Sequence, residues 1–215
     1  MNGVDQPPPP ADQPSQPDRT GAALDLDGLA GHLRALPPSC GPVRLVAVDG
    51  HAGSGKSTFT DRLAAALGGA PVLHLDDLAT HDELFEWTDR FRSQVLDALA
   101  LGRTASYRPY DWVRRAFGPP AALPPAPVVL VEGVGAGRRA LRPHLACLLW
   151  LDLPPCAAWE RGRRRDGPGQ AEFWDGWMRA EQSHFAADPS RPHADFLIRQ
   201  RNAGYAVIPA GQATT

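Results

Sequence analysis

One lysine in this chain has the surroundings of a chemically active residue. Lys56 is the only lysine among 215 residues, and it lies in the segment 50–57, which reads GHAGSGKS. This segment matches the pattern G-x-x-x-x-G-K-[S/T], a loop whose main-chain N–H groups and lysine cradle phosphate groups. An ammonium group is a compact charge that fits between two phosphates, whereas a guanidinium is wide and planar. The pattern therefore predicts nucleotide binding at this loop.

Each part of the loop has an expected role. Main-chain N–H groups from about Ala52 to Ser57 would point at phosphate oxygens, with the positive end of a helix dipole behind them. Gly53 and Gly55 would permit the tight turn, and the Ser57 hydroxyl would ligate Mg²⁺. The residues predicted to bind the nucleotide are Gly50, Ala52, Gly53, Ser54, Gly55, Lys56, Ser57 and Thr58.

The loop lies between a predicted strand and a predicted helix. Residues 44–48 form an apolar run typical of a buried parallel strand, and residues 57–67 have the spacing of an amphipathic helix. Further apolar runs predict strands at 72–75, 128–131, 145–151 and 196–198, and helices are expected at 24–36, 81–101, 155–165 and 170–185. This alternation predicts an α/β fold, a three-layer P-loop NTPase fold with a mostly parallel five-stranded sheet and helices on both faces.

Four of the apolar runs end in acidic residues, namely Asp49, the pair Asp76 and Asp77, Glu132 and Asp152. The carboxyl ends of parallel strands lie along one edge of a sheet, so several carboxylates are expected near the phosphate loop. Phosphoryl transfer requires a metal ion, a cation near the transferring group and a carboxylate that orients and deprotonates the attacking hydroxyl. The pattern favours this chemistry.

The acidic residues differ in their expected roles. Asp76 is the predicted catalytic base because it follows the strand after the phosphate-loop helix, and Asp77 is the alternative; either could instead cap the following turn. Glu132 has the position of a carboxylate that holds Mg²⁺ together with Ser57, or it could bind only the loop backbone. Asp49 could assist the metal or brace the loop.

Five residues at 161–165 include four arginines, and a flexible turn at 166–169 follows them. Residues 161–170 are therefore a predicted lid that closes over the phosphates and excludes water. Arg161 and Arg165 share a helix face because they are four residues apart, and both are predicted catalytic residues alongside Lys56. The alternative is a solvated basic helix end that complements the helix dipole.

An aromatic segment at 105–112, irregular or β-structured, is the predicted acceptor pocket. Aromatic faces stack on planar rings, and the Asp111 carboxylate could accept hydrogen bonds from sugar hydroxyls. The predicted substrate-binding residues are Asp77, Tyr107, Tyr110, Asp111, Trp112 and Arg115. Tyr107, Tyr110 and Trp112 could instead pack in the hydrophobic core. For Trp174 and Trp177, core packing is the default expectation.

Composition limits the other function classes. The net charge of −2 is not the electrostatic footprint of a nucleic-acid-binding protein. No secretory signal and no membrane span are evident, which favours a cytoplasmic protein. The three cysteines are spaced unlike a zinc site or a disulfide framework.

Residues 1–22 are rich in proline and are expected to be a disordered tail, with a single domain at 23–215. The oligomeric state, including a homo-oligomer, stays open.

The order of these motifs resembles the uridine kinase-like branch of the P-loop nucleoside and nucleotide kinases, over about residues 43–198. The resemblance rests on the GHAGSGKS loop, the strand ending LDD, the YDW segment, VEG after the third strand and RGRRRD. It implies ATP and Mg²⁺, with Asp76 activating the 5′-hydroxyl of a nucleoside such as uridine or cytidine. It also implies that Tyr110 and Asp111 border the acceptor and that Arg161 and Arg165 contact ATP phosphates.

The chain departs from this family at one point that bears on the acceptor. Uridine kinases carry a pyrimidine-reading histidine shortly after the tyrosine-aspartate pair, where this chain has VRRAF at 113–117. A non-nucleoside alcohol, such as a sugar, another metabolite or an antibiotic, is therefore an alternative acceptor. A nucleotide-dependent switch is the other alternative, but a switch needs no acceptor base, and the guanine-reading pattern N-K-x-D is absent because Lys56 is the only lysine.

Overall fold

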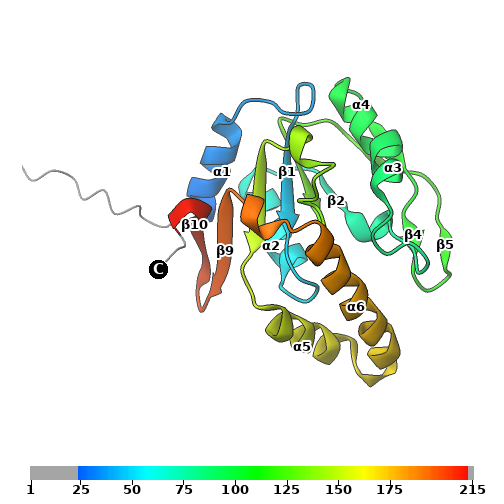
Figure 1. Cartoon of the computed structure of the whole chain (residues 1–215). Coiled ribbons are helices and arrows are strands. Elements are labelled where there is room, and N and C mark those ends of the chain that lie inside the picture. The colour runs from blue at the N-terminus through cyan, green and yellow to red at the C-terminus, as the bar shows by residue number, and fades with distance from the viewer. Residues whose placement is uncertain (1–23, 213–215) are drawn as a thin grey trace, which may run out of the picture.

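A six-stranded sheet forms the middle layer of the molecule, in the order β10–β9–β8–β1–β7–β2 (Figure 1). The computed structural model describes residues 24–212, so the tail predicted at 1–22 lies outside them. The strands are β1 (Arg44–Asp49), β2 (Val72–His74), β7 (Val128–Glu132), β8 (Cys147–Leu151), β9 (Phe196–Arg201) and β10 (Gly204–Pro209). The predicted α/β fold with five parallel strands is confirmed. β10 is a sixth strand that was not predicted, and it pairs antiparallel with β9.

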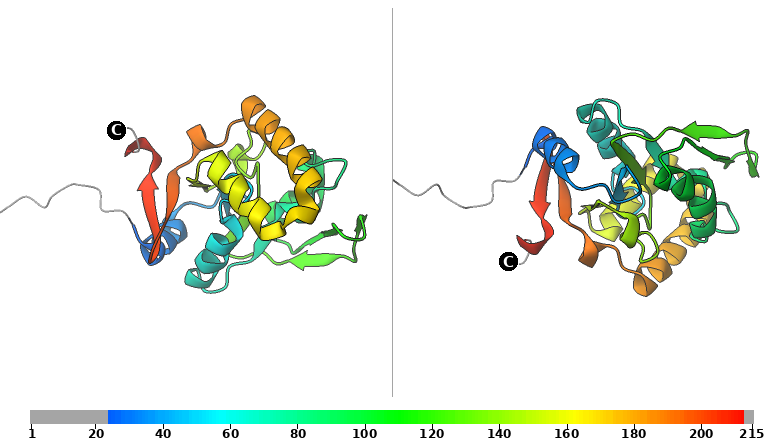
Figure 2. Two further views of the ribbon diagram at one scale, coloured as in Figure 1. Left: turned by 90° about the horizontal axis from the view of Figure 1, so that it is seen from below. Right: turned by 90° about the horizontal axis from the view of Figure 1, so that it is seen from above.

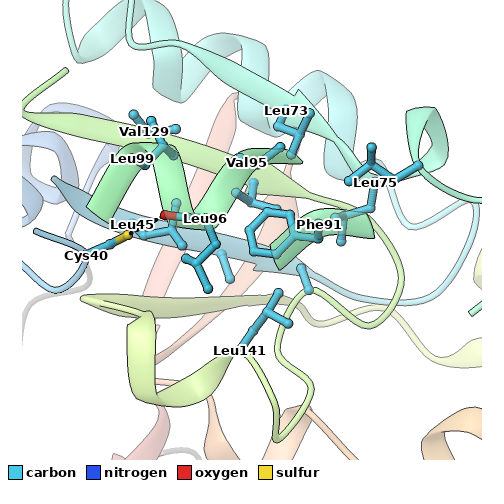
Figure 3. Packing of buried hydrophobic residues seen from close by; sticks show 14 of the residues in the cluster. Cys40, Leu45, Leu73, Leu75, Phe91, Val95, Leu96, Leu99, Val129 and Leu141 are labelled. Carbon is cyan, nitrogen blue, oxygen red and sulfur yellow. Dashed lines mark hydrogen bonds between the residues drawn. The ribbon is translucent and has the colours of Figure 1, made fainter. Parts of the chain in front are cut away.

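Helices cover both faces of the sheet. α1 (Leu26–Ala35) and α2 (Lys56–Ala66) contribute Leu33 and Phe59 to one apolar cluster, which also contains Val46 of β1. Leu45, its neighbour in β1, belongs to the opposite cluster, where Phe91 packs against the sheet (Figure 3). Burial of both faces explains why the central strands are continuous apolar runs rather than alternating ones.

The helix predicted at 81–101 begins later than expected. It comprises α3 (Thr88–Phe91), a π-helical segment (Arg92–Leu96) and α4 (Asp97–Ala100). Residues 80–87 are not helical, because Phe85 turns away to stack on His184 with ring centroids 4.8 Å apart. Arg138 holds this turn by donating to the Phe85 carbonyl at 2.7 Å. Leu84 and Phe85 are therefore apolar because they pack in a separate hydrophobic cluster, and not because they belong to this helix.

Two small antiparallel pairs lie beside this helix. β3 (Ala105–Tyr107) pairs with β6 (Ala121–Leu123), and β4 (Tyr110–Asp111) pairs with β5 (Ala116–Phe117) to form a projecting hairpin (Figure 1). The hairpin turn contains Arg115, the only non-glycine residue in the described part of the chain with a positive φ, at 55°. The segment predicted as irregular or β at 105–112 therefore has the expected character.

α5 (Pro155–Asp166) and α6 (Ala171–Ala187) cross below the sheet at the carboxyl ends of its strands (Figure 2). The predicted lid at 161–170 comprises the end of α5 and a short 3-10 turn at Pro168–Gln170. The other 3-10 turns are Leu75–Asp77, Arg142–His144, Arg191–His193 and Ala210–Gln212. Within residues 24–212, no helix combines the length and the apolar character needed to cross a bilayer.

Gly162 allows α6 to pack closely against α5. A Cβ atom at this position would lie 2.2 Å from the ring of Trp174, so Gly162→Ala is expected to destabilise the protein by about 1–3 kcal/mol. Gly176, in the middle of α6, has open space around it, and Gly176→Ala is expected to stabilise by about 0.5–1 kcal/mol. Chemical denaturation measures both effects. Equal stabilities of the two variants would contradict the close packing.

Candidate active site

The phosphate loop connects β1 to α2 and contains two strained turns that suit glycine. Gly53 and Gly55 have φ values of 82° and 95°, which side chains rarely adopt. A Cβ at Gly53 would lie 2.1 Å from the Ala158 carbonyl oxygen of α5. Glycine at this position therefore permits both the turn and the close approach of α5.

The main-chain N–H groups of the loop divide into two sets. Among the described residues, those of Gly53, Gly55, Lys56, Ser57 and Thr58 have no hydrogen-bond acceptor. These are donors at the start of a helix, where backbone groups and the dipole together favour an anion. All five residues line a cavity of about 420 Å³.

The other set is already paired within the protein. Gly50 N–H donates to Asp49 Oδ1 at 2.7 Å, Ser54 N–H to the His51 carbonyl at 3.0 Å, and Ala52 N–H to Glu181 Oε2 at 3.0 Å. This corrects the expectation that every N–H from Ala52 to Ser57 faces phosphate. The predicted nucleotide-binding residues Gly50, Ala52 and Ser54 thus shape the loop through these bonds, and only Ala52 among them lines the cavity.

The Lys56 side chain folds back over the loop. Its ammonium Nζ donates to the carbonyl oxygens of Gly50 at 3.0 Å and His51 at 3.1 Å, and the residue is buried. Lys56 lines the same cavity as the free N–H groups. The structure therefore brings the one ammonium charge of the side chains and the five free donors to one cleft.

Glu132 lies opposite Ser57 at the end of β7. The Ser57 hydroxyl donates to Glu132 Oε1 at 3.0 Å, and Nδ1 of His74, at the end of β2, lies 2.6 Å from the same oxygen. Burial alone would raise the pKa of Glu132, but the His74 hydrogen bond and the Lys56 charge outweigh it and lower the pKa. The hydroxyl and the ionised carboxylate are hard oxygen donors, so this pair fits Mg²⁺.

Asp76 faces the cleft, whereas Asp77 turns away from it. Asp76 is exposed to the cleft, yet the dense protein around its carboxyl raises the pKa of Asp76; the Glu132 charge adds to this, while Lys56 opposes it. Asp77 accepts a 3.4 Å hydrogen bond from the Tyr107 hydroxyl, and burial raises its pKa as well. Asp76 lines the cleft and Asp77 does not, so the geometry favours Asp76 over Asp77 as the group that contacts a ligand.

A second cavity, of about 640 Å³, adjoins the first. Its walls include the rings of His81, Trp112, Phe173 and Trp174. Four residues line both cavities, namely Ala52, Asp76, Arg165 and Trp177. A carboxylate and a guanidinium thus lie where a phosphate-binding cleft meets an aromatic pocket.

The predicted lid arginines occupy different parts of the cleft. Arg161 lines the first cavity, and its Nη1 donates to Gln200 Oε1 of β9 at 3.3 Å. Arg165 makes a two-pronged ion pair with Asp166, at 2.6 Å and 3.0 Å, and this hydrogen bonding raises the pKa of Arg165. Trp174 Nε1 also donates to Asp166, at 3.0 Å. Asp166 therefore fixes the guanidinium at the junction of the cavities.

The predicted acceptor residues are dispersed. Trp112 lines the aromatic cavity, and its Nε1 donates to the Asp76 carbonyl at 3.1 Å. Tyr110 lies behind it, with its hydroxyl 3.1 Å from His81 Nδ1, and Tyr107 is largely buried in the core. Asp111 accepts from the N–H groups of residues 113 and 114 and so caps the hairpin turn. Arg115 is exposed in that turn and lines neither cavity.

The other two strand-end acids have structural partners. Asp49 is fully buried and accepts from the N–H groups of Gly135 and Gly137 at 2.9 Å and 2.8 Å, so it is the internal brace rather than a metal ligand. Asp152 pairs with Arg191 and Arg199. The predicted gathering of carboxylates is therefore limited to Asp76 and Glu132.

Three residues of the site carry no motif of their own. His81 lines the aromatic cavity from the non-helical segment before α3, and His74 bonds the Glu132 carboxylate. Glu181 of α6 accepts hydrogen bonds from two phosphate-loop residues, His51 and Ala52. For His74, the apolar pattern of β2 indicates only that the residue lies where the strand ends. No local sequence pattern identifies His81 or Glu181 as residues of the site.

Comparison with known proteins gives structural relatives only. No protein-family model and no curated protein sequence matches this chain. A possible uridine kinase from Bacillus stearothermophilus superposes with a TM-score of 0.60 at 17% identity, covering 80% of this chain and 96% of that one. A proposed fructose transport system kinase from Silicibacter sp. TM1040 gives 0.56 at 23% identity, covering 76% and 89%. The chain therefore has the P-loop kinase fold.

Proposed function

We propose that this protein is an ATP-dependent kinase that transfers the γ-phosphoryl group of ATP to a hydroxyl group of a small molecule. One observation carries the proposal: Asp76 and Arg165 line both the cleft of the phosphate loop and the adjoining aromatic cavity. A transferring phosphoryl group must reach from one ligand to the other, and this junction offers a base and a cation there. The P-loop kinase fold supports the same function.

In this proposal each residue of the cleft has a separate role in binding ATP or in transferring its phosphoryl group. The free N–H groups and Lys56 bind the phosphates, and Asp76 orients the acceptor hydroxyl and takes its proton as the new O–P bond forms and ADP leaves. Arg161 and Arg165 place positive charge near the transferring group. Ser57 and Glu132 would hold Mg²⁺, which neutralises charge on the terminal phosphates when bound.

The aromatic cavity bears on the acceptor. Planar rings stack favourably on tryptophan and phenylalanine, so the half-buried Trp112 and Phe173 support a nucleoside, uridine- or cytidine-like, as the leading acceptor. A relative of known structure that is described as a possible uridine kinase supports this choice. A non-nucleoside alcohol is the second candidate. A relative of known structure is described as a proposed fructose transport system kinase, and residues 113–117 lack the pyrimidine-reading histidine of the family that the sequence resembles.

An ATP-consumption screen tests the function. The purified full chain is mixed with Mg²⁺-ATP and, in turn, with nucleosides, sugars and amino alcohols, and the phosphorylated product is identified by its mass. We expect one acceptor class to raise ATP consumption well above the rate with water alone. Binding of ATP without consumption for any acceptor would instead favour a nucleotide-dependent switch.

Arg165 offers a specific test of the junction. Arg165→Ala is expected to lower kcat by about 10²-fold while the dissociation constant of ATP changes little, because the guanidinium acts on charge that develops during transfer. Steady-state kinetics and calorimetry separate the two effects. Arg163→Ala is the matched control, since Arg163 is on the same helix but pairs with Asp175, 2.7 Å away, and lines neither cavity. An unchanged kcat in Arg165→Ala would make the arginine cluster a solvated surface.

A further inference from the structure

A buried carboxylate lies behind the phosphate loop and joins it to the helices α5 and α6. Glu181 is fully buried in α6. Its Oε1 accepts from His51 Nδ1 at 2.6 Å and from Trp159 Nε1 at 3.0 Å. Its Oε2 accepts from Ala52 N–H at 3.0 Å and from Trp177 Nε1 at 2.9 Å. One side chain thus binds the loop, α5 and α6 at once.

An ionised carboxylate matches this set of partners. The Trp159 and Trp177 indoles and the Ala52 N–H can only donate, and His51 donates from Nδ1 when Glu181 is ionised. Burial alone would raise the pKa of Glu181, but the His51 and main-chain hydrogen bonds outweigh it and lower the pKa, so the group is ionised at neutral pH. A glutamine of the same shape would keep one acceptor oxygen and turn an NH₂ group toward two donors.

The residues that Glu181 holds are those at the junction of the cavities. Ala52 and Trp177 are two of the four residues that line both cavities. Gly53, next to Ala52, lies against the backbone of α5, which carries Arg161 and Arg165. The position of the free loop N–H groups relative to the lid arginines therefore depends on the four bonds to Glu181.

We propose that Glu181 is the positioning residue that holds the phosphate loop against α5 and α6, so that the loop N–H groups and the arginines of α5 contact the same triphosphate. This inference rests on the proposed ATP-binding function, but its test uses binding and does not require that an acceptor be known. Glu181 touches neither cavity, so it acts through Ala52 and Trp177 and not by contact with ligand.

The main test is Glu181→Gln in the full chain. We expect the dissociation constant of Mg²⁺-ATP, measured by calorimetry, to rise about tenfold or more, because small misplacements of binding groups have large effects. Glu172→Gln, on the exposed side of the same helix, is expected to bind ATP like the wild type. Leu33→Ala removes core packing in α1 and controls for general loss of stability, because Leu33 lines neither cavity; it is expected to melt at a lower temperature with unchanged ATP affinity.

The outcomes separate this inference from the proposed function. Wild-type ATP affinity in a folded Glu181→Gln variant would overturn the inference, and so would an equal loss of affinity in Leu33→Ala. If the wild type binds ATP but phosphorylates no acceptor, the kinase proposal fails and the Glu181 test still stands. Should Glu181→Gln not fold, Trp159→Phe removes one donor and keeps the ring; a severalfold loss of ATP affinity supports the inference, and wild-type affinity overturns it.

Discussion

Replacement of Asp76 by asparagine is expected to lower kcat by roughly 10²- to 10⁴-fold, the usual range for loss of a general base. Asparagine has almost the same shape as aspartate but cannot take the proton of an acceptor hydroxyl. Asp76 lines the same cleft as the phosphate loop but makes no side-chain hydrogen bond to the described loop residues, so the dissociation constant of ATP should stay near its wild-type value. Steady-state kinetics with the acceptor found in the screen, together with calorimetry, measures both quantities.

The pH profile gives the same prediction a second readout. A base acts only when ionised, and the pKa of Asp76 is raised above its ordinary value by the protein around it. In the wild type, kcat/KM should therefore fall as the pH drops through this raised pKa, which places the acidic limb at a higher pH than an aspartate with an ordinary pKa would give. Asp76→Asn should lack that limb.

Asp77 provides the matched control for the base. Asp77→Asn makes the same chemical change one residue away, at a carboxylate that pairs with Tyr107 and lines neither cavity. Its kcat is expected to stay close to that of the wild type. An equal loss of kcat in Asp77→Asn, with an active Asp76→Asn variant, would assign the base to Asp77.

The parts of the site that follow from local sequence were predictable. Residues 50–57 are contiguous, and their chemistry depends on a fixed order of glycine, lysine and serine, so the pattern alone locates the loop. Asp76 and Glu132 end strands that neighbour each other in space, and the rule that parallel strands end at one edge brings them together. Local order and sheet topology are enough for both.

The remaining parts depend on contacts between distant residues. Glu181 bonds His51 and Ala52, which are 130 and 129 positions away, and no spacing within α6 distinguishes it from a solvated glutamate. Asp152 directly follows β8 just as Glu132 ends β7, but Arg191 and Arg199 pair with its carboxylate. A strand-end rule locates acids at the edge and cannot tell which of them is already paired.

The errors in the predicted elements have the same origin. Leu84 and Phe85 fit the apolar spacing of the helix after them, yet they pack in a separate cluster with Trp174 and Trp177 of α6. The apolar periodicity of a sequence indicates that a residue is buried, but it does not indicate which neighbouring element covers it. The apolar pattern did not predict β10 because its residues 204–209 form an edge strand that ends in proline and is stabilised by antiparallel pairing with β9.

Replacement of Lys56 by alanine is expected to reduce kcat/KM for ATP by about 10²- to 10³-fold, because the only ammonium side chain of the cleft is lost beside five free N–H donors that remain. Lys56→Arg should not restore activity. Nζ lies 3.0 Å and 3.1 Å from two loop carbonyls in a buried position, and a planar guanidinium is too wide for that space. Arg62→Ala, on the exposed side of the same helix, is the control, and it should bind ATP normally. If Lys56→Ala binds and consumes ATP like the wild type, the phosphate loop is not the nucleotide-binding site. The reason is that this site combines the loop N–H donors with the ammonium charge of Lys56.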